Sequence, residues 1–598
     1  MKFIMKSFIK NNIQKILVFM FVCFTTIFDA NAQMFVANNT SVYVDGTGFY
    51  CAGDINLETE TSTIYLRNEA QLIQSSESNS NKGLGKISVY QEGTTHQFAY
   101  NYWCSPVGNN SANTTINNPF RVNQIHDPLL NTPNPIDSQI AQFTGGYNGT
   151  SNPLTIAKPW LYTYAAVATA VTWNLVGDTG IIAPGLGFTM KGTSGSNNNQ
   201  AYDFRGKPNT GNISNTVLAS QWTLIGNPYP SALDAAAFIH DTDNVNAISG
   251  TLYFWEQDLS VASHTTSDYV GGYAAYTISA DGAVETFTPA PFNTYNQDGS
   301  INVSGNPNNN ISGKLVKRYL PIGQGFLVQG KIGTSGIVTA KNAHRTYYKE
   351  SGSESEFFRT NATYSNTNTS LPIDYKRFRL NLDFNDTYTR QLLQTFHSDA
   401  TTGFDYGLEN KCLNILNTDA YWETNAVFYT SQALSFDPQI GIPLTLKLSA
   451  NTTVRFRLFD VQNFDANQSI YLFDSVTGIY YNLTDSNTEL TLVAGIYTNR
   501  FEIRFYNNTL SADEIETKKD LWLYYQKSNA QIIINNISNL VIEKVDLYDL
   551  TGKIVLSKEI NADTKQITIP VSNVATGVYI CNIKSVTKEK ISEKIIIN

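Results

Sequence analysis

Glycine-rich turns are the first feature of this chain that could do chemistry, because such turns can hold phosphate groups. The stretches "IAPGLGFTMKGT" (182–193) and "LPIGQGFLVQGK" (320–331) both contain G-x-G-F with another glycine four residues after the phenylalanine. A phosphate-binding loop, however, spaces its glycines as G-x-G-x-x-G and leads into a helix. Both stretches lack that spacing and continue into sequence that excludes a helix. We therefore interpret them as the mark of a duplicated β structure, in which glycines permit a close approach of backbones.

Metal-binding residues are the next candidates. The six histidines are dispersed and have no paired metal spacing, and the chain has neither a G-x-S-x-G elbow nor a P-loop. The stretch "HDTDNVN" (240–246) offers Asp241, Asp243 and Asn244, as a calcium loop would. Val245 stands where an oxygen ligand belongs, however, and no glycine follows, so we interpret this stretch as a polar turn. We expect no metal and no cofactor.

Carboxylates and aromatic rings leave two alternatives open. Asp399, Asp405 and Glu409 follow His397 and could form a polar cluster in a hydrolase, although a connection between strands explains them as well. Aromatic residues near turns could stack on sugar rings, although packing in the core is the default for each. These candidate ligand-binding residues are Trp103, Tyr229, Trp255 and Trp422.

The elements that must position these residues are strands. The chain has 598 residues, 34 tyrosines and 32 phenylalanines, but only 15% charged residues. Short runs of period two, such as "KRFRLNLDF" and "TVRFRLFD", end at Gly, Asn, Asp, Ser or Pro, which is typical of all-β proteins. The best helical candidate is "PYPSALDAAAFI", where Ser231 and Asp234 have the spacing of a capping box.

The pattern predicts a multidomain all-β protein of β-sandwiches. The G-x-G-F stretches each follow a Trp before a proline-bearing turn and an aromatic strand, "PWLYTY" or "GTLYFWEQ". This repeated order predicts an internal duplication. The expected regions are a small β region with short strands or a solenoid-like cap (33–98), a duplicated region (99–350, copies 99–212 and 213–350), a β-sandwich (351–510), a linker (511–520) and an immunoglobulin-like sandwich (521–598).

The N-terminal 32 residues predict a secretory signal peptide. Four lysines precede an apolar stretch at 16–28, and "ANA" places cleavage between Ala32 and Gln33. The apolar stretch is too short to cross a membrane comfortably, so we expect no transmembrane helix in the mature chain. Removing four lysines and one aspartate changes the net charge from −9 to −12, which argues against nucleic acid as a partner.

Four cysteines remain after the signal is removed: Cys51, Cys104, Cys412 and Cys581. They are far apart in sequence and form no C-x-x-C, so neither a zinc site nor a disulfide framework is indicated. We expect free thiols, with a Cys51–Cys104 disulfide as the alternative, because export permits oxidation.

The C-terminal region predicts about seven strands and carries three motifs: "VDLYDLTGKIV" (545–555), "ATGVYICNI" (575–583) and "KISEKIIIN" (590–598). Through them, residues 520–598 resemble the type A C-terminal sorting domain of proteins exported by the type IX secretion system. The motif residues are Asp549, Gly552, Lys553, Gly577, Tyr579 and Lys594. The upstream blocks "YNYWCSPVG", "GNPYPSALDA", "YFWEQ" and "IGQGFLVQG" resemble β-rich cargo found in front of such tails.

The resemblance implies a route. The chain would pass through the periplasm of a Gram-negative bacterium and cross the outer membrane with the type IX machinery as partner. It would then be released or attached to surface lipopolysaccharide. We therefore expect a secreted or cell-surface protein without enzymatic activity that serves adhesion or envelope interaction. The alternatives are a polysaccharide-binding protein and a secreted glycoside hydrolase.

Overall fold

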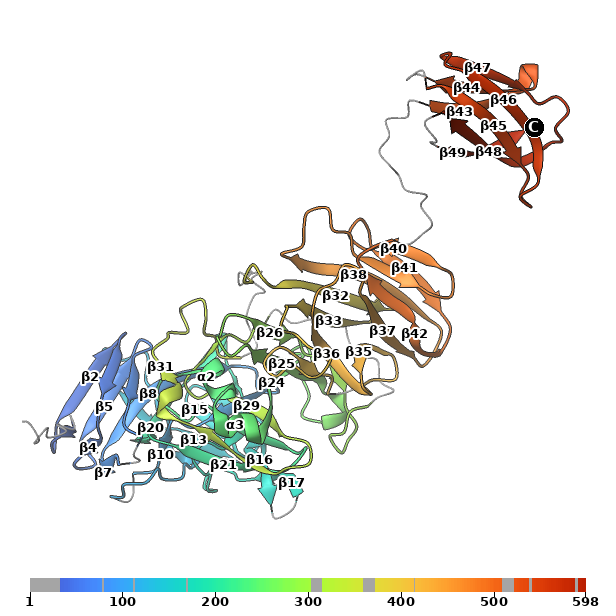
Figure 1. Cartoon of the computed structure of the whole chain (residues 1–598). Helices are drawn as coiled ribbons and strands as arrows, with labels where there is room; N and C mark the ends of the chain where they lie inside the picture. The colour runs from blue at the N-terminus through green and yellow to red at the C-terminus, as the bar shows by residue number, and fades with distance from the viewer. Residues whose placement is uncertain are drawn as a thin grey trace, which may run out of the picture. The chain divides into compact units, whose positions relative to one another are not determined.

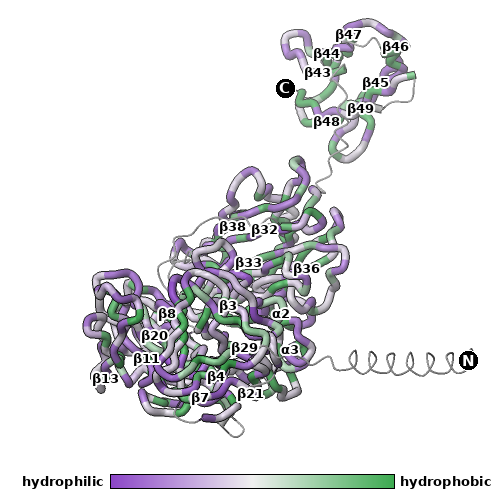
Figure 2. The backbone as a smooth tube through the Cα atoms, turned by 90° about the vertical axis from the view of Figure 1, so that its left-hand side faces the viewer, coloured by the Kyte–Doolittle hydropathy of each residue, from purple (hydrophilic) through white to green (hydrophobic). Residues whose placement is uncertain are grey.

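The computed structural model describes residues 33–77, 80–110, 113–167, 170–302, 314–358, 371–413, 415–507, 521–536, 540–586 and 590–597. The chain divides into two compact units, residues 1–507 and 508–598, which are considered separately. Strands dominate both units, so the predicted all-β fold is confirmed (Figure 1). Hydrophobic and hydrophilic residues alternate over short distances along the chain, as expected for strands with one buried face (Figure 2).

The predicted signal peptide, including Ala32, lies outside the described residues, which begin at Gln33. The predicted linker 511–520 also lies outside them. Within the part of the chain that is described, no helix has the length and apolar character needed to span a membrane.

The first eight strands form a short parallel solenoid. They are β1 (Met34–Val36), β2 (Ser41–Asp45), β3 (Gly48–Cys51), β4 (Ile55–Leu57), β5 (Thr63–Arg67), β6 (Gln71–Gln74), β7 (Lys82–Gly83) and β8 (Lys86–Thr94). β1, β4 and β7 stack in parallel, as do β2, β5 and β8, and β3 pairs in parallel with β6. Buried aliphatic residues such as Ile55, Ile64 and Leu72 fill the interior.

Two antiparallel sheets of matching order form the centre of the first unit. The first sheet contains β9 (Tyr100–Cys104), β16 (Tyr162–Val167), β17 (Ala170–Leu175) and β18 (Gly187–Lys191). The second contains β22 (Trp222–Gly226), β24 (Ile248–Gln257), β25 (Val270–Ile278), β26 (Glu285–Thr288) and β29 (Gly325–Gly330). Their orders are β17-β16-β18-β9 and β25-β24-β29-β22, with β26 added beside β25. A duplication would produce this correspondence, but the duplication itself stays a prediction.

The G-x-G-F motifs lie where these two sheets meet. Gln324, between the glycines of the second motif, forms an isolated antiparallel bridge with Trp103 of the first sheet. Leu186, between the glycines of the first motif, forms the reciprocal bridge with Ile225 of the second sheet. A Cβ atom on Gly325 would lie 2.7 Å from the backbone nitrogen of Trp103. Glycine is therefore required here because two backbones approach each other more closely than a side chain allows.

The remaining strands of the central region connect it to its neighbours. They are β10 (Val107–Gly108), β11 (Ile125–Pro128), β12 (Ser138–Ile140), β13 (Gln142–Thr144), β14 (Gly149–Ser151), β15 (Leu154–Ala157), β19 (Thr193–Ser194), β20 (Asn199–Pro208), β21 (Ile213–Val217), β23 (Ala232–Asp234), β27 (Asn293–Thr294), β28 (Tyr319–Leu320), β30 (Gly336–Ala340) and β31 (Arg345–Thr346). β20 pairs antiparallel with β8 of the solenoid, so hydrogen bonds cross the boundary expected at 98 and 99.

Helices are short. The described helices are α2 (Ala235–Ile239), α3 (Thr242–Ala247) and the single 3-10 turns η1 (Val122–Gln124), η2 (Lys158–Trp160), η3 (Thr266–Asp268), η4 (Asn342–His344) and η5 (Lys527–Asn529). A helix lies within the predicted stretch "PYPSALDAAAFI", but it begins three residues later than a Ser231 cap would place it, because Ala232–Asp234 form β23. Asp234, rather than Ser231, accepts the backbone N–H groups of Ala236 and Ala237, because Ser231 is buried before β23.

One sheet of eleven strands curves around a single core over residues 376–504. Its strands are β32 (Lys376–Phe384), β33 (Tyr388–Phe396), β34 (Asn410–Lys411), β35 (Asp419–Thr424), β36 (Val427–Leu434), β37 (Gly441–Leu448), β38 (Thr452–Gln462), β39 (Tyr471–Asp474), β40 (Ile479–Asn482), β41 (Thr488–Leu492) and β42 (Gly495–Arg504). Phe378, Trp422 and Phe501 are buried in that core. Arg379 donates to the Phe287 carbonyl at 2.8 Å, so this region packs on the central region.

The second unit is a seven-stranded β structure of two sheets. Its strands are β43 (Leu521–Gln526), β44 (Gln531–Asn536), β45 (Ile542–Tyr548), β46 (Ile554–Ala562), β47 (Gln566–Pro570), β48 (Gly577–Ser585) and β49 (Lys590–Ile597). The sheets have the orders β43-β44-β47 and β46-β45-β48-β49. Val545 and Leu547, which alternate with Asp546 and Tyr548 along β45, belong to the core between the sheets.

Candidate functional site

A cleft lined by aromatic rings lies between the two matching sheets of the central region. Its volume is about 490 Å³. Four of the chain's seven tryptophans line it, together with seven tyrosines. These residues are Tyr100, Tyr102, Trp160, Tyr162, Tyr164, Trp173, Trp222, Trp255, Tyr269, Tyr273 and Tyr295. We call this site the aromatic cleft.

Strand pleating decides which rings face the aromatic cleft, because successive side chains point to opposite sides of a sheet. On β9, Tyr100 and Tyr102 line the cleft, whereas Trp103 is fully buried in the core on the other side. On β24, Trp255 lines the cleft, whereas Phe254 belongs to the core on the other side of the second sheet. The alternation of aromatic residues thus produces both a core and the lining of a cleft from the same strands.

Tyr102 lies at the centre of the ring contacts. Its ring centroid is 6.3 Å from that of Trp173, 6.3 Å from that of Tyr273 and 6.5 Å from that of Trp255. Its hydroxyl group is 2.8 Å from the hydroxyl group of Tyr273. Burial raises the pKa of both tyrosines, so both hydroxyl groups stay protonated and uncharged at neutral pH.

A buried ammonium group supports one end of the aromatic cleft. The Nζ atom of Lys191 lies 3.8, 4.8 and 4.9 Å from the ring centroids of Trp160, Tyr100 and Tyr269, and it donates to the Tyr269 hydroxyl at 2.6 Å. It is also 3.0 Å from Nδ1 of His264, whose ring stacks on Trp160. Burial lowers the pKa of Lys191 to about 7. The three rings therefore pack around one buried amine, and its protonated form attracts their faces.

Charged groups are scarce on the lining. Among the described lining residues, Asp298 alone carries a charge at neutral pH, and its carboxylate accepts hydrogen bonds from the backbone N–H and the hydroxyl of Ser300. Gln297, Thr189 and Thr266 add neutral polar groups. Such a surface of ring faces with a few neutral donors suits an uncharged ligand that has both apolar faces and hydroxyl groups.

The four ligand-binding candidates from the sequence separate into two groups. Trp103, Tyr229 and Trp422 are fully buried, so they pack in cores, which was the default alternative for each. Tyr229 donates to the Gly211 carbonyl at 2.6 Å, and the Trp422 indole donates to the Leu393 carbonyl at 3.0 Å. Trp255 alone lines the aromatic cleft.

Sequence reasoning did not identify the other ten cleft aromatics as ligand-binding candidates. The sequence contains a signal for part of them, because "PWLYTY" and "GTLYFWEQ" are aromatic strands of similar pattern. What the sequence lacked was the pairing that brings these strands together. Trp160 comes from η2, just before β16, and continues the two-residue spacing of Tyr162 and Tyr164, whereas Tyr295 comes from the segment after β27.

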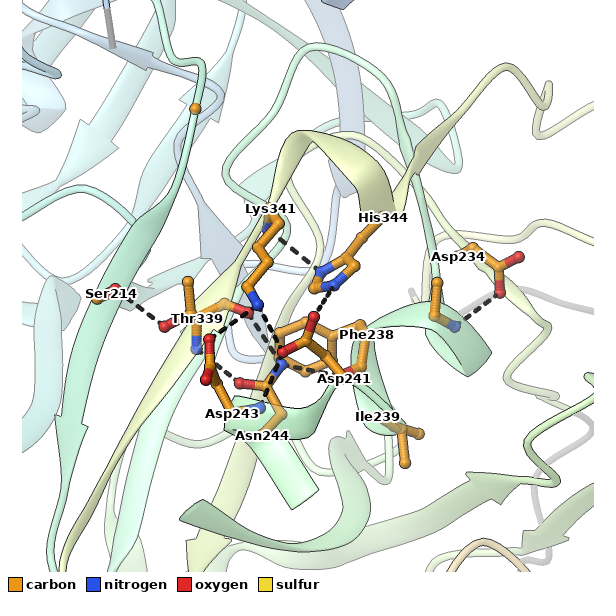
Figure 3. A network of polar contacts seen from close by, with 12 residues as sticks. Ser214, Asp234, Phe238, Ile239, Asp241, Asp243, Asn244, Thr339, Lys341 and His344 are labelled. Carbon is orange, nitrogen blue, oxygen red and sulfur yellow. Dashed lines mark hydrogen bonds and ion pairs between the residues drawn. The ribbon is translucent and has the colours of Figure 1, made fainter. Parts of the chain in front are cut away.

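In the stretch 240–246, the carboxylates that resemble calcium ligands bind the ammonium group of Lys341. Lys341 places its Nζ atom 2.8 Å from Asp241 and 2.8 Å from Asp243, and His344 lies 3.0 Å from the other carboxylate oxygen of Asp241 (Figure 3). Burial of Asp241 raises its pKa, but hydrogen bonds from Lys341 and His344 outweigh this and lower it. The expected polar turn is corrected to a helix, because Asp241 caps α3 by accepting the Asp243 N–H.

Asn244 fixes this α3 segment to strand β30. Its amide group donates to the carbonyls of Phe238 and Thr339 and accepts the Thr339 N–H at 2.7 Å (Figure 3). Asp241, Asp243 and Asn244, whose residue types resemble those of a calcium loop, therefore have structural roles in capping and docking. In the ranges that the structure describes, no group of three or more His, Cys, Asp or Glu side chains could hold a metal ion.

The carboxylates near His397 have different surroundings, since one is exposed to solvent and another is bound to backbone N–H groups. His397 stacks on Tyr375 and lies 3.2 Å from Asp374, while the side chain of Asp399 is largely exposed. Glu409 is buried and accepts the backbone N–H groups of Ala433 and Asp405. Burial raises the pKa of Glu409 to about 7.

The four cysteines that the structure describes form no disulfide with one another. Cys51, Cys104 and Cys581 are buried and Cys412 is half-buried. Burial raises the pKa of Cys581 to about 12 and also raises those of Cys51 and Cys104. The alternative disulfide between Cys51 and Cys104 does not form in this structure.

The sorting-domain motif residues shape turns and strand starts. Asp549 accepts the backbone N–H groups of Thr551 and Lys553, and Gly552 adopts a left-handed φ of 83° in the same turn. Gly577 begins β48, and Tyr579 donates from its hydroxyl to the Ala575 carbonyl at 2.6 Å. The last motif residue, Lys594, pairs with Ile580 between β49 and β48.

Comparison with known families shows to which protein family the chain belongs. Residues 144–505, more than half of the sequence, match the family described as "Domain of unknown function (DUF8693)". The chain belongs to this family. The DUF8693 region contains every element of the aromatic cleft except β9, and it continues through the eleven-stranded sheet.

Residues 526–598 match the "Secretion system C-terminal sorting domain". This match confirms the predicted recognition of the tail, so this DUF8693 chain is a cargo of the type IX secretion system. It is therefore exported to a secreted or cell-surface location, and its tail interacts with the type IX machinery.

No curated protein matches the chain. Among solved structures, a chain described as "Biofilm associated protein - BSP domain" is similar at 9% sequence identity with a TM-score of 0.11. The match covers 73% of this chain and 85% of that chain.

Proposed function

We propose that the exported chain is a non-enzymatic binding protein that attaches to neutral polysaccharide through the aromatic cleft, and that it serves adhesion outside the cell. The observation that supports this proposal is the lining of the cleft by eleven aromatic side chains in a volume of about 490 Å³. Pyranose rings present C–H groups on their faces and hydroxyl groups at their edges. Aromatic faces and neutral polar groups complement both features.

Among the alternatives, the lining supports binding over hydrolysis. Glycoside hydrolysis usually requires two carboxyl groups on either side of the scissile bond. Asp298 is the single carboxylate among the described lining residues, and it is exposed and hydrogen-bonded to Ser300. Glu409, the buried carboxyl with a raised pKa, is bound to backbone N–H groups of its own region.

A glycan array tests the proposal. The mature chain, residues 33–598, is labelled and applied to immobilised neutral and charged glycans. We expect binding to neutral glycans, and we expect Trp173→Ala to weaken it about tenfold, because stacking on this ring is lost. Trp173 is 46% exposed, so the substitution should leave the fold intact.

Trp522→Ala is the matched control, since Trp522 is 43% exposed and belongs to the second unit. It should bind as the unchanged chain does. Absence of binding to every glycan would contradict the proposal. Shortening of a bound glycan during incubation, lost on replacing one carboxylate, would instead favour the hydrolase.

A further inference from the structure

The two sheets that enclose the aromatic cleft present corresponding aromatic pairs. In the first sheet, Tyr164 of β16 is paired directly with Trp173 of β17. In the second sheet, Trp255 of β24 is paired directly with Tyr273 of β25. Each pair thus consists of one tyrosine and one tryptophan on neighbouring antiparallel strands, and all four residues line the cleft.

The strand register shows that these pairs occupy equivalent positions. Tyr162 is paired with Thr189, two residues after Gly187 of the first G-x-G-F motif. Tyr253 is paired with Leu327, two residues after Gly325 of the second motif. Tyr164 and Trp255 each follow two residues later on their strands. The first pair therefore lies at the same place relative to the first motif as the second pair does relative to the second.

Both pairs consist of rings in close contact. The ring centroids are 4.6 Å apart for Tyr164 and Trp173, and 5.2 Å apart for Trp255 and Tyr273. The ring of Tyr102 lies between the pairs, since its centroid is 6.3 Å from that of Trp173 and 6.5 Å from that of Trp255. The hydrogen bond between the hydroxyl groups of Tyr102 and Tyr273 fixes this central ring to the second pair.

From this correspondence we propose that the aromatic cleft contains two equivalent subsites, one on each Tyr–Trp pair, and that its ligand is a neutral oligosaccharide whose sugar units occupy both at once. This inference rests on the proposed function and specifies its ligand. A repeating polymer offers the same apolar ring face twice along its length, as two equivalent subsites require. One isolated sugar would cover a single pair and leave the other in contact with water.

Calorimetry with the mature chain tests the two subsites. The probes are two series of neutral β-linked oligosaccharides, built of glucose and of N-acetylglucosamine, from the monosaccharide to the hexasaccharide. We expect weak binding of the shortest members and a steep rise in affinity once the oligosaccharide reaches both pairs. We expect Trp173→Ala and Trp255→Ala each to weaken hexasaccharide binding about tenfold and to flatten the dependence on length.

A conservative exchange keeps the test independent of folding. Trp255→Tyr places at the second pair the residue that the first pair has at the equivalent position, so it should retain most of the affinity that Trp255→Ala loses. Trp522→Ala serves as the control outside the cleft. Circular dichroism and thermal unfolding of each variant separate a loss of the site from a loss of the fold.

The outcomes distinguish the two proposals. Equal affinity for the monosaccharide and the hexasaccharide would overturn the two subsites and leave glycan binding in place. The same conclusion would follow if only one of Trp173→Ala and Trp255→Ala lowered the affinity for the hexasaccharide. A preference for charged glycans on the array would overturn the neutral ligand class. No binding to any glycan would remove both this inference and the function on which it rests.

Discussion

Gln324 and Trp103 form an isolated β-bridge between the two central sheets, although they lie in different copies of the predicted duplication. This bridge places Gly325 against the backbone of Tyr102 and Trp103, the strand that carries the central ring of the aromatic cleft. The glycine of the G-x-G-F motif thus controls how closely the two walls of the cleft approach.

Gly325→Ala should destabilise the first unit. The new Cβ atom would lie 2.7 Å from the backbone of Trp103, so the sheets must separate, at a cost of about 1–3 kcal/mol in the free energy of unfolding. Urea unfolding followed by tryptophan fluorescence measures the change. Gly145→Ala is the matched control, because a Cβ there meets no atom within 4 Å. Equal unfolding midpoints for the two variants would contradict the close crossing.

Glu409 should make stability fall as pH rises from about 4.5 to about 7. Burial raises its pKa from 4.5 to about 7, so the folded chain retains a proton that the unfolded chain releases in this range. Stability is greatest below the lower value and becomes constant above the upper one, with a total difference of about 3 kcal/mol. Glu409→Gln should remove this component, as measured by urea unfolding across the pH range.

The exposed carboxylate of Asp399 provides the control for that measurement. Asp399→Asn makes the same change from acid to amide at a side chain that is 88% exposed, and it is unfolded beside Glu409→Gln under the same conditions. If Glu409→Gln and the unchanged chain showed parallel pH profiles, Glu409 would have no raised pKa in the folded state.

The thiols should react according to burial. With iodoacetamide under native conditions, half-buried Cys412 should be alkylated first, while Cys51, Cys104 and Cys581 should react only after unfolding. Burial excludes the reagent and raises the pKa of these thiols, which removes the reactive thiolate. Intact-mass measurement without reductant should show four thiols in the mature chain. A mass lower by two hydrogens would instead indicate a disulfide.

The tail should be necessary and sufficient for export across the outer membrane. A chain ending at Asn507 should accumulate in the periplasm, and residues 508–598 behind a neutral carrier with the signal peptide should direct that carrier outside. Cell fractionation followed by immunoblotting measures both. Full export of the shortened chain would contradict the role of the tail.

A point substitution probes the fold of the tail. Gly552→Val places a β-branched residue at a φ of 83°, which costs on the order of 1–2 kcal/mol. If the type IX machinery recognises this turn, export of Gly552→Val should fall. The Trp522→Ala variant should be exported normally.

The sequence predicted features that depend on local patterns. Period-two runs identified the all-β class, because a strand with one buried face must alternate apolar and polar residues. The motifs around Gly552 and Gly577 identified the sorting domain, since turn chemistry and strand starts are specified by neighbouring residues. The helix after Asp234 was also predicted, although its cap was misplaced by three residues.

The aromatic cleft could not be predicted in this way. Whether Trp103 or Tyr102 faces a core or a cleft depends on which sheet packs against β9, and that partner is distant in sequence. The ion pair of Asp241 could not be predicted either, because its partner Lys341 is about one hundred residues away in the sequence. Local sequence therefore determined the strands, their turns and the sorting domain that directs export of this protein. Only the tertiary structure decided which rings line the aromatic cleft, because their exposure is set by contacts between segments that the chain brings together on folding.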